Sequence, residues 1–334
     1  MNIIFSEASG VNDSIFGKCQ APIRMFIEQR GEAHEQESIL QHIFSMGTSK
    51  KFGDMLTSMT AMEGFMPVGE NGAYPVDGMQ EGYRKFIEYL EWKDSFSLSK
   101  KIIEDADLMD LKKKPAAFMT AYGRTREKFG AALYAGAILG NKTIKFRGMS
   151  FDATSADGEA MFSTKHKPKI KGDVQSNRFS DAFSVDALDR AESAMQLFRG
   201  DNDEILDVAP DTILIPNDPD LKRAVFAAVG ADKDPMTANN GFNYQFGRWN
   251  IIIWSYLNQF IGKGSKPWIL MDSKYNEAYG GAVWNDRVAL EINSYIDNGT
   301  DANVWNGRSR FNAAFNDFRF AAVGGMEGGT NLAG

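Results

Sequence analysis

The chain has 334 residues, of which 43% are hydrophobic and 24% charged, a balance that excludes disordered, collagen-like and disulfide-dense proteins. With 37 basic and 44 acidic residues its net charge is -7, which excludes coating of nucleic acid through overall positive charge but leaves a local basic face open. One cysteine, no secretory signal and no apolar run near the roughly 20 residues of a membrane span predict a soluble, cytoplasmic product. The length suggests about two domains.

Residues 1–62 are predicted to be an arm rather than a domain, because their apolar residues are sparse and scattered. The clearest pattern lies in residues 35–46, where Ile39, Leu40, Ile43 and Phe44 share one face of a short helix. Such a segment cannot close a core by itself, so we expect it to pack on something else.

Residues 61–80 are rich in Gly and Pro and are predicted to be a loop. In residues 81–98 the odd-numbered and the even-numbered positions both carry aromatic and charged side chains. This pattern predicts a strand exposed on two faces, although a helix also fits. A strand without a buried face suits an extended hairpin or an interface. The candidate inter-subunit contacts are therefore Glu81, Tyr83, Arg84, Lys85, Phe86, Glu88, Tyr89, Glu91 and Trp92.

The strongest helix is predicted over residues 107–140, where aromatic and small residues recur at spacings of three, four and seven. Pro115 suits the first turn or a kink, and Gly140 supplies a stop. The apolar positions are Phe118, Tyr122, Phe129, Leu133 and Gly136.

Short strands in a polar loop are predicted for residues 141–180, followed by an α/β unit over about residues 180–290. Its helices are expected at 184–198, which opens on a Ser cap, and at 219–229, with apolar strands at 212–216, 250–256 and 268–272. In residues 310–323 apolar side chains recur at every second position, and this alternation shifts by one residue partway along the segment. The shift predicts a strand with a bulge or turn near Asn316. The Gly-rich tail after it is expected to be flexible.

No constellation in the chain predicts catalysis, a cofactor or a metal. His34 and His42 are eight residues apart, which does not suit a helical metal site, and His166 lies in a Lys-rich loop where we expect it to be exposed. The segment 262–266 lacks the spacing of a phosphate loop and is better explained as a turn. What distinguishes the chain is its architecture of a long arm, a projecting loop, a long helix, a compact α/β unit and a late return strand. Arms and two-sided hairpins bury little apolar surface in a monomer, so they point to an assembly protein.

Several segments in order resemble the Mu-like major head subunit family of tailed-phage capsid proteins, which adopt the Hong Kong 97-type fold. The resemblance covers about residues 80–325 and rests on order and spacing rather than on one decisive motif. The segments that carry it are Thr125–Ala137, Met161–Pro168, Ser184–Gln196, Ala209–Val225, Trp249–Leu257, Pro267–Asp272 and Asn303–Gly325.

The resemblance implies an α+β fold with named parts. These are an N-terminal arm (1–62), an extended loop (63–98), a peripheral domain (99–179) with a spine helix at about 107–140, an axial domain (180–290), return strands of the peripheral domain (291–325) and a flexible tail (326–334).

The resemblance also implies a structural function. Pentamers and hexamers of this chain would close an icosahedral shell around double-stranded DNA, in a virion assembled in the cytoplasm of a bacterial host. The implied partners are a portal protein, a decoration protein and, because the chain begins at Met1 with a short arm, a separate scaffolding protein. Arg24, Arg30, Lys50 and Lys51 are the candidates for non-specific contact with DNA; the alternative is that they are ordinary solvated charges.

Two other functions remain open from the sequence. An encapsulin-like shell shares the fold but encloses protein cargo. A soluble enzyme or glycan-binding protein would use exposed aromatic residues such as Trp249, Trp254 and Trp268, although core or interface positions explain these residues better.

Overall fold

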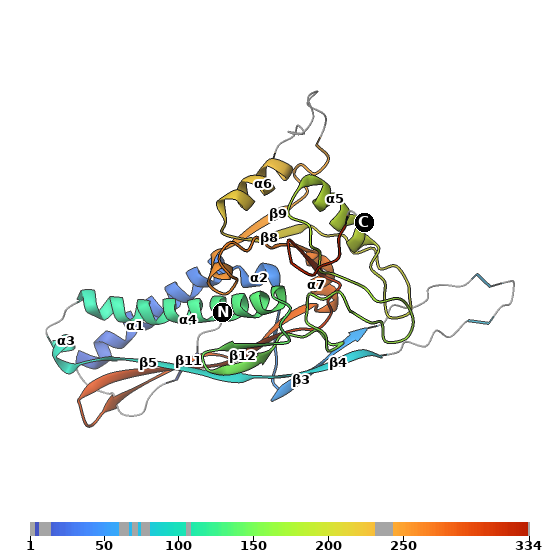
Figure 1. Ribbon diagram of the computed structural model, residues 1–334. Helices are drawn as coiled ribbons and strands as arrows, with labels where there is room; N and C mark the ends of the chain where they lie inside the picture. The colour runs from blue at the N-terminus through green and yellow to red at the C-terminus, as the bar shows by residue number, and fades with distance from the viewer. Residues whose placement is uncertain are drawn as a thin grey trace.

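Figure 1 shows the computed structural model, in which a long helix lies across a twisted sheet, an α/β unit stands over one end of that helix, and a hairpin lies at the far edge. The structure describes residues 4–6, 15–59, 67–68, 73–74, 81–104, 108–230 and 243–332.

The long helix is α4, Leu108–Ile138, close to the predicted range. It ends where Gly140 adopts a left-handed φ of 74°, a conformation that favours glycine. Pro115 lies two turns inside the helix, so the predicted first-turn position is wrong. From Phe129 to Ile138 the helix is buried on nearly all sides, because sheets and loops pack around it.

The sheet beneath α4 has five strands in the order β1-β11-β12-β5, with β2 also paired to β11. β11 (Ala282–Asp297), β12 (Ala302–Phe315) and β5 (Leu90–Leu98) are antiparallel neighbours, whereas β1 (Ile4–Ser6) and β2 (Ser45–Thr48) run parallel to β11. Phe129 of α4 packs against Trp92, Trp284 and Phe311 of this sheet, with ring centroids 5.5, 5.7 and 6.2 Å away. The return strands predicted over residues 291–325 include only the second part of β11, and its first part was not predicted.

The arm contains α1 (Ile15–Glu37), the one-turn α2 (Leu40–Ile43) and β2. The single helix predicted for residues 35–46 is therefore wrong. The chain breaks at Ser38 and Ile39, whose hydroxyl and backbone N–H both donate to the Glu127 carboxylate, at 2.7 and 3.0 Å. The side chains of Leu40, Ile43 and Phe44 are buried against the core of the same subunit. The arm thus packs on other elements, as expected for a segment that cannot form a core by itself.

The α/β unit is built on a second sheet, in the order β13-β10-β8-β9. Its strands are β8 (Thr212–Pro216), β9 (Asn250–Trp254), β10 (Trp268–Met271) and β13 (Ala321–Gly324). α5 (Val185–Gln196) is capped by Ser184 as predicted, and α6 (Pro219–Val229) by Asp218. The short helices η1 (Ser255–Gln259) and α7 (Ser273–Tyr279) complete the unit.

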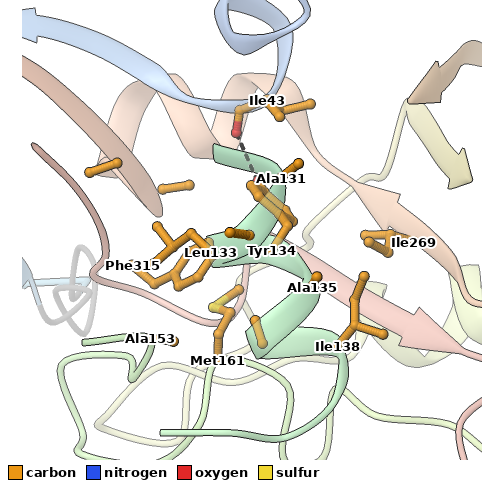
Figure 2. Close-up of a cluster of buried hydrophobic side chains, with 14 of the residues drawn as sticks. Ile43, Ala131, Leu133, Tyr134, Ala135, Ile138, Ala153, Met161, Ile269 and Phe315 are labelled. Carbon is orange, nitrogen blue, oxygen red and sulfur yellow. Dashed lines mark hydrogen bonds between the residues drawn. The ribbon is translucent and has the colours of Figure 1, made fainter. Parts of the chain in front are cut away.

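The predicted shift near Asn316 is confirmed as a complete break. β12 ends at Phe315 in one sheet, and β13 begins at Ala321 in the other. The Asn316 N–H donates to the Gly281 carbonyl at 2.7 Å, so the crossing is fixed by the backbone. One core therefore spans both sheets, with Tyr134 and Leu133 of α4 lying near Phe315, and Tyr134 donating to the Ile43 carbonyl at 2.9 Å (Figure 2).

The remaining elements are two hairpins and a short helix. β3 (Gly53–Met59) pairs with β4 (Glu81–Glu88), and β6 (Thr143–Phe146) pairs with β7 (Met149–Asp152), while α3 (Lys100–Glu104) precedes α4. β3 thus joins the hairpin although its residues were assigned to the arm, and β5 joins the sheet although its residues were assigned to the loop.

The C-terminal residues 326–332 are held in place, so the expected flexibility is wrong for this part of the tail. Met326 N–H donates to the Phe179 carbonyl at 3.0 Å, and Thr330 N–H to the Arg178 carbonyl at 2.8 Å. Leu332 N–H donates to the Asp181 carboxylate at 2.9 Å. These bonds satisfy the backbone groups of a segment whose composition alone indicates disorder.

Candidate assembly surfaces

The β3–β4 hairpin has one buried face and one exposed face, so the prediction of a strand exposed on both faces is wrong, as is the helical alternative. Lys85 and Ile87 point into the subunit, whereas Arg84, Phe86 and Glu88 point outward. The inner face is buried because residues 154–169 and β12 cover it.

Tyr89, at the break between β4 and β5, fixes the hairpin to the sheet. Its hydroxyl donates to Asp54 Oδ2 at 2.5 Å and accepts from Asn285 Nδ2 at 2.9 Å. The hydrogen bond from Tyr89 lowers the pKa of Asp54, and burial raises the pKa of Tyr89. This bond joins β3 to the five-stranded sheet.

Lys85 is a second attachment point of the hairpin. Its buried ammonium lies 3.1 Å from Asp152 Oδ2 and donates to the Thr154 carbonyl. Burial lowers the pKa of Lys85, an effect that the negative charge of Asp152 opposes. Tyr83 adds a bond from its hydroxyl to the Lys167 carbonyl at 3.4 Å.

Three of the candidate contact residues thus use their side chains within the subunit, and for them the prediction is corrected. Lys85 and Tyr89 are buried by the contacts above. Trp92 lies on β5, where its ring stacks on Phe311 at 4.9 Å and its indole N–H donates to the Phe311 carbonyl at 3.2 Å. These three side chains pack within their own subunit. The sequence pattern alone did not distinguish such positions from positions at a subunit interface.

The hairpin exposes Met55 and Phe86 on its outer face, and Phe52, directly before β3, is also exposed; we call these three side chains the hairpin patch. Phe52, Met55 and Phe86 are 62%, 57% and 53% exposed. Met55 and Phe86 are directly opposed in the strand register, so they form one surface. A contiguous exposed apolar surface of this kind marks an interaction site.

Two of the charged contact candidates are Glu81 and Glu91. Glu81 pairs with Met59 in the register of the hairpin, and its side chain lies outside the described residues. Glu91 accepts from Arg308 Nε and lies 2.9 Å from Lys93 Nζ, and these two cations lower its pKa to about 2.

The structure does not gather the candidate DNA-facing residues into one patch. Arg30 is exposed on α1, whereas Lys50 and Lys51 are exposed between β2 and β3. Lys51 also lies 3.8 Å from Asp54 Oδ1. The side chain of Arg24 lies outside the described residues.

His166 is the largest error of the sequence analysis about a side chain. It was expected to be exposed, but it is completely buried, with its ring stacked on Phe318 at a centroid distance of 3.8 Å. Its Nδ1 lies 2.6 Å from Asp157 Oδ2 and its Nε2 lies 3.1 Å from Asn177 Oδ1. The alternation in the Lys-His-Lys run was the available signal, because lysines that point outward leave the histidine to point inward.

One buried and one half-buried set of ion pairs were also not predicted from the sequence. The Arg319 guanidinium bridges Asp201 at 2.8 Å and Asp317 at 3.2 Å, and Arg126 makes a bidentate pair with Asp286 at 2.8 and 3.0 Å. These charges are desolvated but paired, which is how an interior tolerates them. The pairs of Arg319 with Asp201 and of Arg126 with Asp286 link segments far apart in the sequence, and nothing in the local pattern indicates these partners.

The groups that could perform chemistry are few in the described part of the chain. No cluster of three His, Cys, Asp or Glu there is placed to hold a metal ion. No helix among the described residues is long and apolar enough to cross a membrane. Trp254 and Trp268 are fully buried and Trp249 is half-buried, so the first two lie in the core and not in a sugar-binding site.

The comparisons with known proteins agree with this picture of an assembly subunit. A family model described as phage capsid protein matches residues 90–324, more than two thirds of the chain. The chain belongs to this phage capsid protein family. It is therefore a structural component of the virion and not an enzyme, as the sequence predicted. No curated protein sequence matches the chain.

Solved structures resemble the fold at low sequence identity. The capsid of Ralstonia phage GP4 is 10% identical, with a TM-score of 0.51 over 86% of this chain and 90% of that one. A structure from Mycobacterium phage Patience is 13% identical, with a TM-score of 0.48 over 97% and 92%. A virus-like particle from Pyrococcus furiosus is 10% identical, with a TM-score of 0.45 over 92% and 97%. The predicted α+β, Hong Kong 97-type capsid fold is confirmed.

Proposed function

We propose that this capsid protein is the major subunit of an icosahedral phage head of the Mu-like kind, in which pentamers and hexamers tile a shell around double-stranded DNA. The observation that carries this proposal is the exposed hairpin patch of Phe52, Met55 and Phe86. It lies on the β3–β4 hairpin, at the other end of the molecule from α1 (Figure 1). Apolar side chains on a projecting hairpin gain free energy only when another surface covers them.

The proposed contact is heterologous, with the hairpin patch of one subunit lying on a different surface of the next. Contacts of that type close into rings, which suits five- and six-fold capsomers. Many modest contacts repeated around a shell give a stable assembly through multivalency. Arg84 and Glu88, beside the patch, would set the register of the contact.

The domain division of the resemblance is part of this proposal, with one change. We assign the hairpin to residues 53–88, since β3 pairs with β4, and β5 to the peripheral domain, since it pairs with β12. The four-stranded sheet with α5 and α6 would be the axial domain around the symmetry axes. A portal protein, a scaffolding protein and a decoration protein are the proposed partners, with non-specific DNA contacts from Arg24, Arg30, Lys50 and Lys51.

The test is assembly of the purified chain, followed by size-exclusion chromatography and negative-stain electron microscopy, with the scaffolding protein supplied if needed. Wild-type protein should form shells, sheets or tubes of five- and six-fold rings, and Phe86→Ser should lower the assembled fraction about tenfold or more. The matched control is Leu197→Ser, because Leu197 is 63% exposed but lies outside the hairpin. A discrete monomer or small oligomer at every concentration would overturn the proposal, and protein cargo in place of nuclease-sensitive content would indicate an encapsulin-like shell.

A further inference from the structure

A ridge of lysines adjoins the root of the hairpin. Residues 165–171 contain four lysines, of which Lys165, Lys167 and Lys171 are exposed and make no ion pair with any acid in the described residues. These three form what we call the lysine ridge. Lys169 differs, because its ammonium donates to the Gly82 carbonyl at 2.7 Å and so helps to hold the hairpin.

The backbone holds the lysine ridge rigidly. His166 is buried against Phe318, and its backbone exchanges two hydrogen bonds with Gln175, at 3.1 and 2.8 Å. Successive side chains of an extended segment point to opposite sides, so a buried His166 keeps Lys165 and Lys167 outward. Lys171 is fixed by a backbone bond to the Asp201 carbonyl at 2.9 Å. A fixed backbone leaves only the lysine side chains to be ordered on binding.

The lysine ridge adjoins the hairpin at its inner face, opposite the face that carries Met55 and Phe86. Tyr83 of β4 donates to the Lys167 carbonyl, so ridge and hairpin are joined directly. A neighbouring subunit that packs against this end of the molecule would meet the hairpin patch on one side of the hairpin and the lysine ridge on the other. Three unpaired like charges at an interface repel unless the partner supplies acids.

The same chain offers acids at the other side. Residues 28–37 of α1 contain four glutamates and one arginine. Glu28 and Glu32, four residues apart, lie one above the other on one helix face, and they are exposed together with Glu37. Ile27 and Gly31 are buried, on the side where α1 packs along α4. α1 lies across the molecule from the hairpin (Figure 1), as the complementary half of a heterologous contact must.

We infer that the lysine ridge of one subunit docks on the Glu28–Glu32 face of α1 in a second copy of this chain. The inference rests on the proposed function, because it requires copies to pack side by side. It adds an electrostatic contact to the apolar one made by the hairpin patch. The two contacts together fix the orientation of one subunit relative to the next. An apolar patch alone lets the subunits rotate against each other, whereas a pattern of charges does not.

The test is a charge reversal with rescue. Lys165→Glu/Lys167→Glu/Lys171→Glu should leave the thermal unfolding of the subunit unchanged and lower the assembled fraction about tenfold at about 0.15 M NaCl. Glu28→Lys/Glu32→Lys should do the same. The chain that carries both sets should recover assembly to within about threefold of wild type, because attraction is restored with the signs exchanged.

The matched control is Lys113→Glu/Lys263→Glu/Lys274→Glu, which makes the same change in net charge at exposed lysines elsewhere. Wild-type-like assembly of either single-sided variant, an equal loss in the control, or failure of the combined chain to recover would each overturn the inference. Normal shells with less enclosed DNA in the ridge variant would also overturn it and assign the ridge to phosphate contacts. If wild-type protein itself never assembles, the proposed function has failed, and the pairing with it.

Discussion

The C-terminal half of α4 and the β3–β4 hairpin show how one chain separates the stability of its fold from its capacity to assemble. Phe129, Leu133 and Tyr134 of the helix are enclosed by two sheets of their own subunit. The hairpin is covered on one face only, and it is held there by polar bonds from Lys85 and Tyr89 rather than by a core of its own. The helix therefore stabilises the subunit, whereas the hairpin leaves its apolar side chains for a neighbour.

The largest effect is expected from Phe129→Ala. The ring contacts several aromatic side chains and is completely buried, so its removal should lower the free energy of unfolding by about 3–5 kcal/mol. Urea denaturation of the unassembled subunit measures this. Phe86→Ala is the control on the hairpin, where the change should stay within about 0.5 kcal/mol. Equal losses in the two variants would contradict the contrast between helix and hairpin.

An intermediate effect is expected from Tyr89→Phe, which removes the bond between the hairpin and the sheet. The change leaves Asp54 and Asn285 without their shared partner, so unfolding should become easier by about 1–3 kcal/mol at neutral pH. Urea titrations of the two proteins give the difference. The matched change Tyr279→Phe, at a half-exposed tyrosine of α7, should have little effect.

The same bond predicts a dependence on pH. Because the folded pKa of Asp54 lies below its ordinary value of 3.8, its carboxylate stabilises the fold above that pH, and the contribution is lost as pH falls through the folded pKa. The difference in stability between wild type and Tyr89→Phe should therefore shrink in acid. A difference that stays constant down to pH 3 would show that the lost energy comes from packing and not from the Tyr89–Asp54 bond.

The sequence predicted the parts of the fold that rest on local pattern. α4, α5, α6 and β8 follow from periodic apolar residues with a cap or a stop at their ends, and the break at Asn316 follows from a change of phase. The first part of β11 was not predicted, because the two faces of this strand of 16 residues are covered unevenly and its burial does not alternate regularly. The capsid class came from the order of several segments, not from any one of them.

The contacts of individual side chains were less predictable, because they depend on distant partners. Trp92 and Tyr89 are residue types that are common at interfaces. Trp92 packs against the core because Phe129, Phe151 and Phe311 meet it there, and Phe311 is more than 200 residues away in the sequence. Lys85 and His166 are polar residues in polar segments, yet Asp152 and Asp157 make their burial tolerable. The hairpin patch follows from the strand register, which the sequence does not specify.

The smallest effect is expected at Glu91, which sharpens the contrast between exposed and buried polar contacts. Its pKa is lowered from 4.5 to about 2 by Arg308 and Lys93, so any stabilisation is complete above pH 4.5 and is lost as pH falls toward 2. Since the Glu91 side chain is exposed, water and salt screen the pair, and Glu91→Gln should barely change unfolding at neutral pH. NMR titration of the side chain should give a midpoint near 2 that rises toward 4.5 in high salt or in Arg308→Gln. A low pKa at Glu91 together with a marked loss of stability in Glu91→Gln would contradict this expectation. It would mean that exposure does not decide how much a polar contact stabilises this subunit, and that the Tyr89–Asp54 bond need not contribute more than the Glu91–Arg308 pair.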